Sequence, residues 1–313
     1  MIACTALRQL AVVPLRLAYD GRIAVSETVP LVSFASDYLA QLEAFAASAR
    51  LPRVRALHLP PQRLQHDNRG EFCALELDDG SIGLSFVLLD DTLVRLTRER
   101  LDLGGADALD LARRYATDTG YWKTVGFAAA NALSRCLFDR AGFRPDDSAD
   151  SIGQMNPGPG DRVGMIGLFT PLVGRILATG ASLVVLELKE DLAGERDGYR
   201  VTLDPAELAH CTKIVSTSTL LINDTLDRVV TLCRGARTFA MIGPSAGCLP
   251  DALFARGVTL VGGTWIRDRE AFTAALVAGE PLGAHTSKFA LTAERYPGWR
   301  ALVARTGRAA GAA

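Results

Sequence analysis

The sequence predicts an α/β fold: a doubly wound parallel sheet with helices on both faces in the second half, preceded by a smaller α+β domain. Three observations predict it. In the second half, five short apolar runs alternate with segments of helical periodicity. In the first half, Asp-Gly turns join apolar runs. A segment rich in proline, glycine and aspartate separates the two halves.

The second half supplies the predicted parallel strands. The short apolar runs occupy residues 162–168, 183–188, 213–217, 238–242 and 258–261. None alternates cleanly between polar and apolar residues, which is typical of strands covered by helices on both faces. Helical periodicity occurs in residues 171–179, 224–234, 249–256 and 268–278. Such sheets bind ligands beyond the carboxyl ends of their strands, so these ends predict the position of a site.

The first half is predicted to contain antiparallel strands and helices. An apolar run at residues 10–18 predicts a strand before the Tyr19-Asp20-Gly21 turn, and Asp79-Gly80 predicts a second hairpin. Predicted helices occupy residues 33–49, 106–118 and 121–138. The segment 144–161 then places a boundary between an N-terminal domain, 1–150, and a ligand-binding domain, 151–313.

Composition excludes several classes of protein. The chain has 313 residues, 49% of them hydrophobic, and a net charge of −1, with basic and acidic residues interspersed. This gives no electrostatic footprint for nucleic acid or an anionic membrane. No run is long enough to span a membrane, and Pro14 and Arg16 interrupt the first apolar run, which argues against a signal peptide. Six cysteines without a CxxC pair favour reduced thiols in a cytoplasmic protein.

A partial nucleotide-binding pattern surrounds the first strand of the second half. Gly167 and Thr170 lie in the turn after this strand, and Glu187 follows Gly167 by 20 residues, near the end of the next strand. Glycine allows close backbone approach to a ligand, and an acidic residue at that strand end binds ribose hydroxyls. The full GxGxxG pattern is absent. The alternative is that Gly167 only permits a tight turn and that Glu187 is solvated.

Hydroxyl side chains gather after the third strand, in residues 216–225. Thr217, Ser218 and Thr219 are predicted to bind a phosphate, a carboxylate or another anion at a helix start. Asn223 is included in this predicted site. The alternative is ordinary helix capping by Asn223, Asp224 or Thr225.

Two glycine-rich segments follow the fourth and fifth runs, Gly243 to Gly247 and Gly262 to Trp265. As loops on the same sheet edge, they would complete a shared pocket with the two preceding loops. The first also matches the GxSxG pattern, which would make Ser245 a nucleophile, with Asp268 and His285 in hydrolase order. The alternative is a glycine-rich turn whose serine at most binds ligand.

Metal-binding patterns are sparse. The four histidines show no HxxxH or HExxH spacing, so His66, His210 and Cys211 are weak candidates, joined in the metal hypothesis by Cys248 and His285. Lys123 and Lys288 could reach a cleft between the domains, or be solvated surface lysines. The small, apolar segment 125–133 fits either packing across the domain boundary or a homodimer interface.

Several strings resemble one family: VGMIGLFTPLVGRI, STSTLLINDTLDRVVTLC, RTFAMIGPSAGCLPDALFARGVTLVGG and VGFAAANAL. Together they are similar, over roughly residues 70–270, to bacterial and archaeal proteins catalogued as "putative heavy-metal chelation". The resemblance implies a small domain like the enolase N-terminal domain, joined to a Rossmann-like domain with a site between them. It also implies a weak link to metal metabolism. Its matching positions are Asn131, Thr219, Asn223, Gly243, Pro244 and Ser245.

Three functional hypotheses follow. The first is an enzyme of small-molecule metabolism that binds a nucleoside-bearing or anionic ligand, with S-adenosylmethionine as the first candidate. Glu187 would hold the ribose, and the residues 217–219 with Ser245 would hold an anionic group. Candidate catalytic residues are Lys123, Asn131, Ser245 and His285. The second is a protein that binds a divalent metal or a metal complex, and the third is a non-catalytic metabolite sensor.

Overall fold

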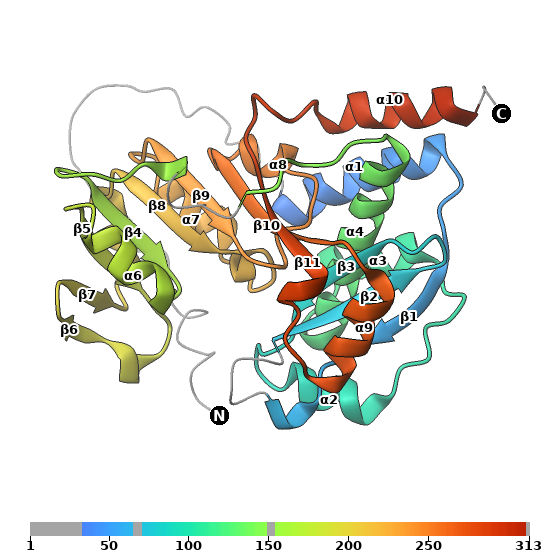
Figure 1. The fold of residues 1–313 in the computed structure, drawn as a ribbon, viewed down its shortest axis with the longest axis horizontal. Coiled ribbons are helices and arrows are strands. Elements are labelled where there is room, and N and C mark those ends of the chain that lie inside the picture. Colours follow the sequence, from blue (N-terminus) through green and yellow to red (C-terminus); the bar gives the residue numbers. More distant parts are fainter. Residues whose placement is uncertain (1–32, 65–70, 149–153, 311–313) are drawn as a thin grey trace, which may run out of the picture.

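The computed structural model describes residues 33–64, 71–148 and 154–310, which form two sheets with their helices (Figure 1). One sheet has three antiparallel strands and the other has eight, mostly parallel. The predicted strand at residues 10–18, the turn at residues 19–21 and His66 lie outside the described residues. Among the described residues, no helix is both long and apolar enough to cross a membrane.

The three-stranded sheet belongs to the first half of the chain. Its strands β1 (Val54–His58), β2 (Phe72–Leu77) and β3 (Ile82–Phe86) lie in the order β1-β2-β3. The Asp79-Gly80 turn joins β2 to β3 as predicted, with Gly80 at a φ of +87°. The predicted helices are confirmed as α1 (Phe34–Ser48), α3 (Ala108–Thr117) and α4 (Gly120–Arg140). Strand β1 and helix α2 (Thr92–Glu99) were not predicted.

Helix α4 is the central helix of this half. A Cβ atom on Gly83 of β3 would lie 2.1 Å from the Ala128 carbonyl oxygen, and one on Gly126 would lie 2.4 Å from the Tyr115 nitrogen. Glycine at these two positions therefore allows α4 to pack directly against β3 and α3. All of residues 125–133 are buried inside the chain. A homodimer, which stays a prediction, would need another surface.

The eight-stranded sheet has the order β11-β10-β9-β8-β4-β5-β7-β6 (Figure 1). The predicted strands are confirmed as β4 (Arg162–Ile166), β5 (Ser182–Leu186), β8 (Lys213–Thr217), β9 (Thr238–Ile242) and β10 (Leu260–Ile266). The structure adds β6 (Gly194–Arg196), β7 (Tyr199–Thr202) and β11 (Thr286–Leu291). Neighbouring strands from β10 to β7 are parallel. At the two edges of the sheet, β11 pairs antiparallel with β10 and β6 pairs antiparallel with β7. If the six parallel strands are numbered in chain order, from β4 as 1 to β10 as 6, they lie in the sheet in the Rossmann order 3-2-1-4-5-6. Successive strands are added on one side of β4 up to β7 and on its other side from β8 onward, so the order reverses between β4 and β8.

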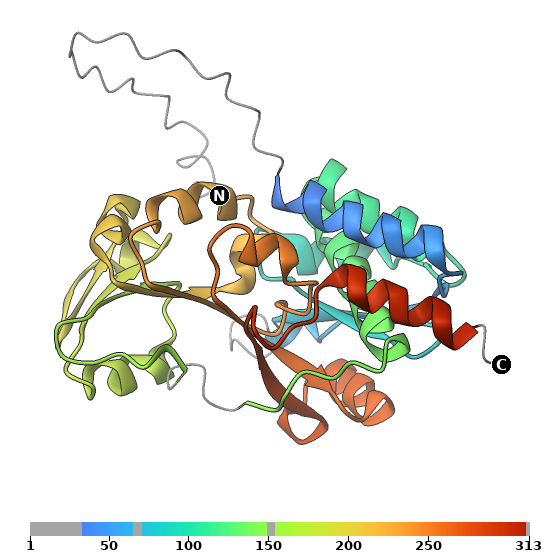
Figure 2. The same cartoon turned by 90° about the horizontal axis from the view of Figure 1, so that it is seen from above.

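Helices flank both faces of this sheet. Helix α6 (Thr170–Leu177) shares one apolar cluster with Met165 and Val185, whereas α7 (Leu226–Leu232) shares another with Ile166 and Val184. Because successive side chains of a strand point to opposite faces, α6 and α7 cover opposite faces (Figure 2). The cluster on the α7 face also contains the core of the first half.

Three further α-helices lie in the described part of this half of the chain. They are α8 (Asp251–Phe254), α9 (Arg269–Ala278) and α10 (Trp299–Ala310). Helix α9 contacts β1, and α10 lies beside α1, so the end of the chain packs on its first half (Figure 2). The division into two domains near residue 150 stays a prediction.

The segment from Gly262 to Trp265 corrects one prediction. The sequence predicts a glycine-rich loop after the fifth strand here, but the segment lies inside β10, paired with β11. A Cβ atom on Gly263 would lie 2.4 Å from the Phe289 ring and 2.9 Å from the Ala246 carbonyl oxygen. Glycine therefore occupies this position because strand packing leaves no room for a side chain.

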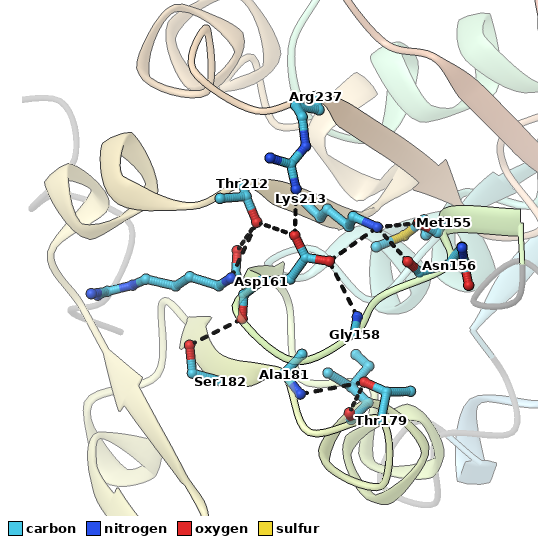
Figure 3. Close-up of polar contacts among 12 residues, drawn as sticks. Met155, Asn156, Gly158, Asp161, Thr179, Ala181, Ser182, Thr212, Lys213 and Arg237 are labelled. Atoms are coloured by element: carbon cyan, nitrogen blue, oxygen red, sulfur yellow. Dashed lines mark hydrogen bonds and ion pairs between the residues drawn. The ribbon is translucent and has the colours of Figure 1, made fainter.

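An ion-pair cluster holds the amino edge of the sheet (Figure 3). The Asp161 carboxylate lies 3.1 Å from Lys213 Nζ and 2.6 Å from Arg237, and accepts from Thr212 Oγ1 at 2.8 Å. Lys213 also donates to the Met155 carbonyl oxygen at 2.7 Å. Burial opposes ionisation of Asp161, but its hydrogen bonds outweigh burial and lower the pKa of this carboxyl. The cluster therefore fastens the segment before β4 to the start of β8.

Candidate functional site

A cavity of about 440 Å³ opens at the carboxyl ends of β4, β5 and β8. It therefore lies where the strand order reverses, which is the usual ligand position in such sheets. Its volume is in the range of small-molecule sites. Of the residues predicted to bind a cofactor, it is lined by Gly167, Glu187, Thr217, Ser218, Thr219, Asn223 and Gly243. Pro244 also lines it.

Gly167 forms the tight turn after β4. Its φ is +81°, and its N–H donates to the Leu186 carbonyl oxygen at 2.9 Å. A Cβ atom here would lie 3.1 Å from Thr217 Cγ2. Both the backbone conformation and the close packing against β8 therefore favour glycine. The small residue leaves the backbone of this turn open to the cavity.

Glu187 directly follows β5, and its carboxylate contacts the turn that contains Gly167. One of its oxygens accepts from the Leu168 N–H at 2.6 Å, and the other accepts from the Leu188 N–H at 3.1 Å. Glu187 is partly exposed at this strand end, and two backbone amides fix the position of its carboxylate. Each carboxylate oxygen has two lone pairs, so both can still accept from a ligand.

The hydroxyl cluster lies at the end of β8. The Thr217 side chain accepts from the Thr219 N–H at 3.2 Å, and the two threonine hydroxyls lie 2.9 Å apart. A Cβ atom on Gly243 would lie 2.3 Å from Ser218 Oγ, so the loop after β9 packs directly against this hydroxyl. The β8 and β9 ends thus form one continuous wall.

Capping explains part of this cluster. Thr217 caps the short 3-10 helix η4 (Ser218–Leu221). Asn223 accepts from the Thr225 N–H at 3.2 Å, and Thr225 is the N-cap residue of α7 but makes no capping side-chain bond. The predicted capping of the following helix by residues 223–225 is therefore wrong, because Asn223 stabilises the turn instead.

Ser245 and its predicted partners do not form a catalytic arrangement. Ser245 is fully buried, and within the described residues its hydroxyl has no hydrogen-bonding partner. Asp268 is occupied in capping α9, where it accepts from the Ala271 N–H at 3.0 Å. His285 lies in η5 (Gly283–His285), beside the end of β10 and outside the cavity lining. Thr170, at the start of α6, is also outside that lining.

Asn131 joins the two halves of the chain. Its Nδ2 donates to the Leu84 carbonyl oxygen at 2.8 Å and to the Ser245 carbonyl oxygen at 3.0 Å. Its Oδ1 accepts from the Tyr38 hydroxyl at 3.0 Å. Both amide protons thus have partners, and only 2% of the residue is exposed. The geometry places Asn131 in the packing between α4, β3 and the β9 loop.

The two candidate lysines differ. Lys123 is buried and forms an ion pair with Asp224, so the interpretation as a solvated surface lysine is wrong for this residue. The ion pair connects α4 to the turn before α7. Lys288, on β11, is exposed as that interpretation predicted.

The described residues do not fit a bare metal ion. Within them, no group of three His, Cys, Asp or Glu residues lies close enough to hold one. His210 and Cys211 precede β8, at the sheet edge opposite the cavity. Burial raises the pKa of the Cys211 thiol, and raises that of Cys248 to about 12, which opposes thiolate coordination. His210 is exposed.

Sequence patterns missed one wall of the cavity. The three-stranded sheet and the segment after it contribute Glu71, Phe72, Phe86 and Leu89. Lys189 and Arg228 complete the charged lining. Burial raises the pKa of the Glu71 carboxyl. The family resemblance implies a site between the two halves, but no sequence pattern singled out Glu71, Phe72, Phe86 or Leu89.

A Rossmann-type sheet with a cavity at its switch point, walled on one side by a second small sheet, defines a class of two-sheet proteins. Two family models match the chain, one over residues 150–293 and the other over residues 70–134. Both are described as "putative heavy-metal chelation", and the chain belongs to this family.

Relatives from several organisms are similar to this chain. An uncharacterised protein of Methanocaldococcus jannaschii is 25% identical over 202 residues, which are 60% of this chain and 71% of that protein. A crystal structure of a DUF364 family protein of unknown function from Desulfitobacterium hafniense has a TM-score of 0.60 at 18% identity, covering 81% of this chain and 98% of its own. Another, from Pyrococcus horikoshii, has a TM-score of 0.59 at 15% identity, covering 82% and 99%. These two structures confirm the fold.

Proposed function

We propose that the cavity binds a small molecule carrying a ribose and an anionic group, and that the protein is an enzyme of small-molecule metabolism. S-Adenosylmethionine is the first candidate ligand. One observation carries the proposal: the Glu187 carboxylate is held 2.6 Å from the Leu168 amide at the end of the second parallel strand. This is where an acidic residue accepts hydrogen bonds from ribose hydroxyls in dinucleotide-binding sheets.

The opposite wall supports an anionic group on the same ligand. Thr217, Ser218 and Thr219 supply hydroxyl donors, and Lys189 and Arg228 supply positive charge on the cavity lining. Leu188 and Leu203 also line the cavity and are 52% and 43% exposed, so a bound ligand would cover apolar surface. Catalysis in such a site would depend on positioning and electrostatics, which are sufficient for an already activated substrate.

Thermal unfolding and calorimetry of the metal-stripped full chain test the proposal. The ligands are S-adenosylmethionine, S-adenosylhomocysteine, NAD, ATP and a panel of divalent cations. At a ligand concentration of about 100 times Kd, linkage predicts about 2.7 kcal/mol of stabilisation. Glu187→Gln should weaken adenosyl binding about tenfold, which corresponds to about 1.4 kcal/mol. Glu190→Gln, on an exposed residue outside the lining, is the matched control and should bind like wild type.

The family description supports a second candidate, binding of a metal or a metal already complexed by an organic ligand. A complexed metal would need no cluster of protein ligands, and the cavity could hold the organic part. Stabilisation by one transition metal alone, with no adenosyl ligand bound, would replace the nucleoside proposal with this one. Tight adenosyl binding without turnover would instead favour a metabolite sensor.

A further inference from the structure

We propose that Glu71, Phe72 and Phe86 form a cation subsite on the cavity wall contributed by the three-stranded sheet. The ligand would then carry a permanent positive charge, such as a sulfonium or an alkylated ammonium, on the side facing this sheet. The inference rests on the proposed function, because the cation would belong to the ligand that occupies the same cavity.

Glu71 is the first component. It directly precedes β2, and its carbonyl oxygen accepts from the Val87 N–H at 2.8 Å, which anchors its backbone to the end of β3. The residue is half-buried on the cavity lining. Within the described residues, no hydrogen bond or ion pair engages its carboxylate. A partly desolvated carboxylate without a partner is stabilised by a cation brought by a ligand.

The other charged residues of the lining leave this carboxylate uncompensated. Glu187 has the same sign and is held by the backbone amides of Leu168 and Leu188. Lys189 follows β5 and Arg228 lies on α7. Both are exposed, and neither forms an ion pair with Glu71. The raised pKa of the Glu71 carboxyl is consistent with the lack of a neighbouring cation.

The aromatic pair is the second component. Phe72 and Phe86 lie directly opposite each other on β2 and β3, with ring centroids 5.7 Å apart and planes inclined by 68°. Both line the cavity next to Glu71, and both are only partly buried. Aromatic faces attract cations and bind sulfonium and quaternary ammonium groups without requiring a hydrogen bond. A carboxylate beside such a pair therefore favours a permanent cation over a neutral group of equal size.

The two walls of the cavity would then recognise opposite charges. Hydroxyls at the end of β8, with Lys189 and Arg228, suit the anionic end of the ligand, and Glu71 with its aromatic neighbours suits the cationic centre. A nucleoside sulfonium with an amino-acid tail has this separation of charge. The first half of the chain would thus select the ligand, while the strand ends of the second half hold it.

Calorimetry with a sulfonium and its neutral thioether tests the subsite. In the wild-type chain, S-adenosylmethionine should bind about tenfold more tightly than S-adenosylhomocysteine. Glu71→Gln should abolish most of this preference while leaving thioether affinity unchanged, and Phe86→Leu should reduce it. Glu190→Gln should preserve it. Circular dichroism and urea unfolding would show that each variant is folded.

The outcomes separate the two proposals. Equal affinity of the wild-type chain for both ligands, or an equal loss for both in Glu71→Gln, would overturn the cation subsite and leave nucleoside binding intact. Failure of both ligands to bind would overturn the proposed function. In that case tetramethylammonium tests the subsite alone, observed by NMR. Resonance shifts that disappear in Glu71→Gln would support it, and the absence of any shift would reject it.

Discussion

The side-chain amide of Asn131 donates to the Ser245 carbonyl oxygen at 3.0 Å and so joins helix α4 to the loop after β9. The same nitrogen donates to Leu84 on β3. A single buried side chain therefore connects the first sheet to the β9 loop, whose residues Gly243 and Pro244 line the cavity. Residues from both sheets line that cavity.

Replacing Asn131 should separate these elements. Asn131→Asp keeps the shape of the side chain but removes both donors, which leaves the Leu84 and Ser245 carbonyl oxygens facing a carboxylate. We expect the free energy of unfolding, measured with urea, to fall by about 2–4 kcal/mol. Ser134→Ala, which removes one hydroxyl that contacts Tyr38 at 2.6 Å, should cost about 1 kcal/mol. An Asn131→Asp midpoint equal to that of wild type would contradict this role.

Gly167→Ala tests the tight turn at the site. The new methyl group would require a left-handed backbone and would approach Thr217, so we expect loss of both stability and ligand affinity. Gly105→Ala is the matched control, because Gly105 has a φ of +77° but open space around its Cβ position. The control should lose about 1–2 kcal/mol from backbone strain alone, with unchanged binding. Equal effects of both substitutions would argue against a crowded turn.

The Asp161 cluster should make stability depend on acidic pH. The folded-state pKa of Asp161 is lower than its ordinary value of 3.8, because hydrogen bonds from Thr212, Lys213 and Gly158 together outweigh burial. The ionised carboxylate therefore stabilises the fold above that ordinary value, and this contribution is lost as pH falls through the lower folded-state pKa. At neutral pH, the free energy of unfolding of Asp161→Asn should be about 1.5–3 kcal/mol lower than that of wild type. This difference should shrink in acid. A pH-independent difference between the two proteins would refute the assignment.

The cysteines should be unreactive in the folded protein. The five described cysteines are buried, and burial raises the pKa of Cys73, Cys233 and Cys248 to about 12. In a Cys4→Ser background, a thiol reagent at pH 8 should modify these side chains slowly, then rapidly in guanidinium. Cadmium should likewise produce no thiolate absorption in the native state. Rapid native-state modification or cadmium absorption would contradict buried thiols.

Strands were predictable from the sequence where both of their faces are buried. The runs at residues 162–168 and 213–217 are apolar because helices cover both sheet faces, and that signal is local. Strands β6 and β11 were missed because they lie at sheet edges, where side chains are partly exposed. The prediction of a loop at Gly262 and Gly263 is wrong, because glycine occurs both in turns and in closely packed strands and a local pattern does not distinguish the two.

Sequence patterns predicted the residues of the site at the strand ends of the eight-stranded sheet, but not those contributed by the three-stranded sheet. Glu187, Gly167 and residues 217–219 follow parallel strands, and the carboxyl ends of such strands meet at one edge whatever their separation along the chain. Ser245 also follows a strand, yet the β9 loop turns it into the core, where Asn131 holds its carbonyl. Loop direction is set by packing with a distant helix, which no local pattern encodes.

The sequence by itself determined the class of fold, most of its parallel strands and the edge where a ligand would bind, since all three depend on short-range periodicity and on general rules of sheet connection. Only the tertiary structure decided that Glu71 and Phe86 face this edge, that Lys123 pairs with Asp224, and that Ser245 is buried. Each of these depends on contacts between segments far apart in the chain. Such contacts are selected by the packing of complete surfaces, and that packing exists only once both sheets have formed.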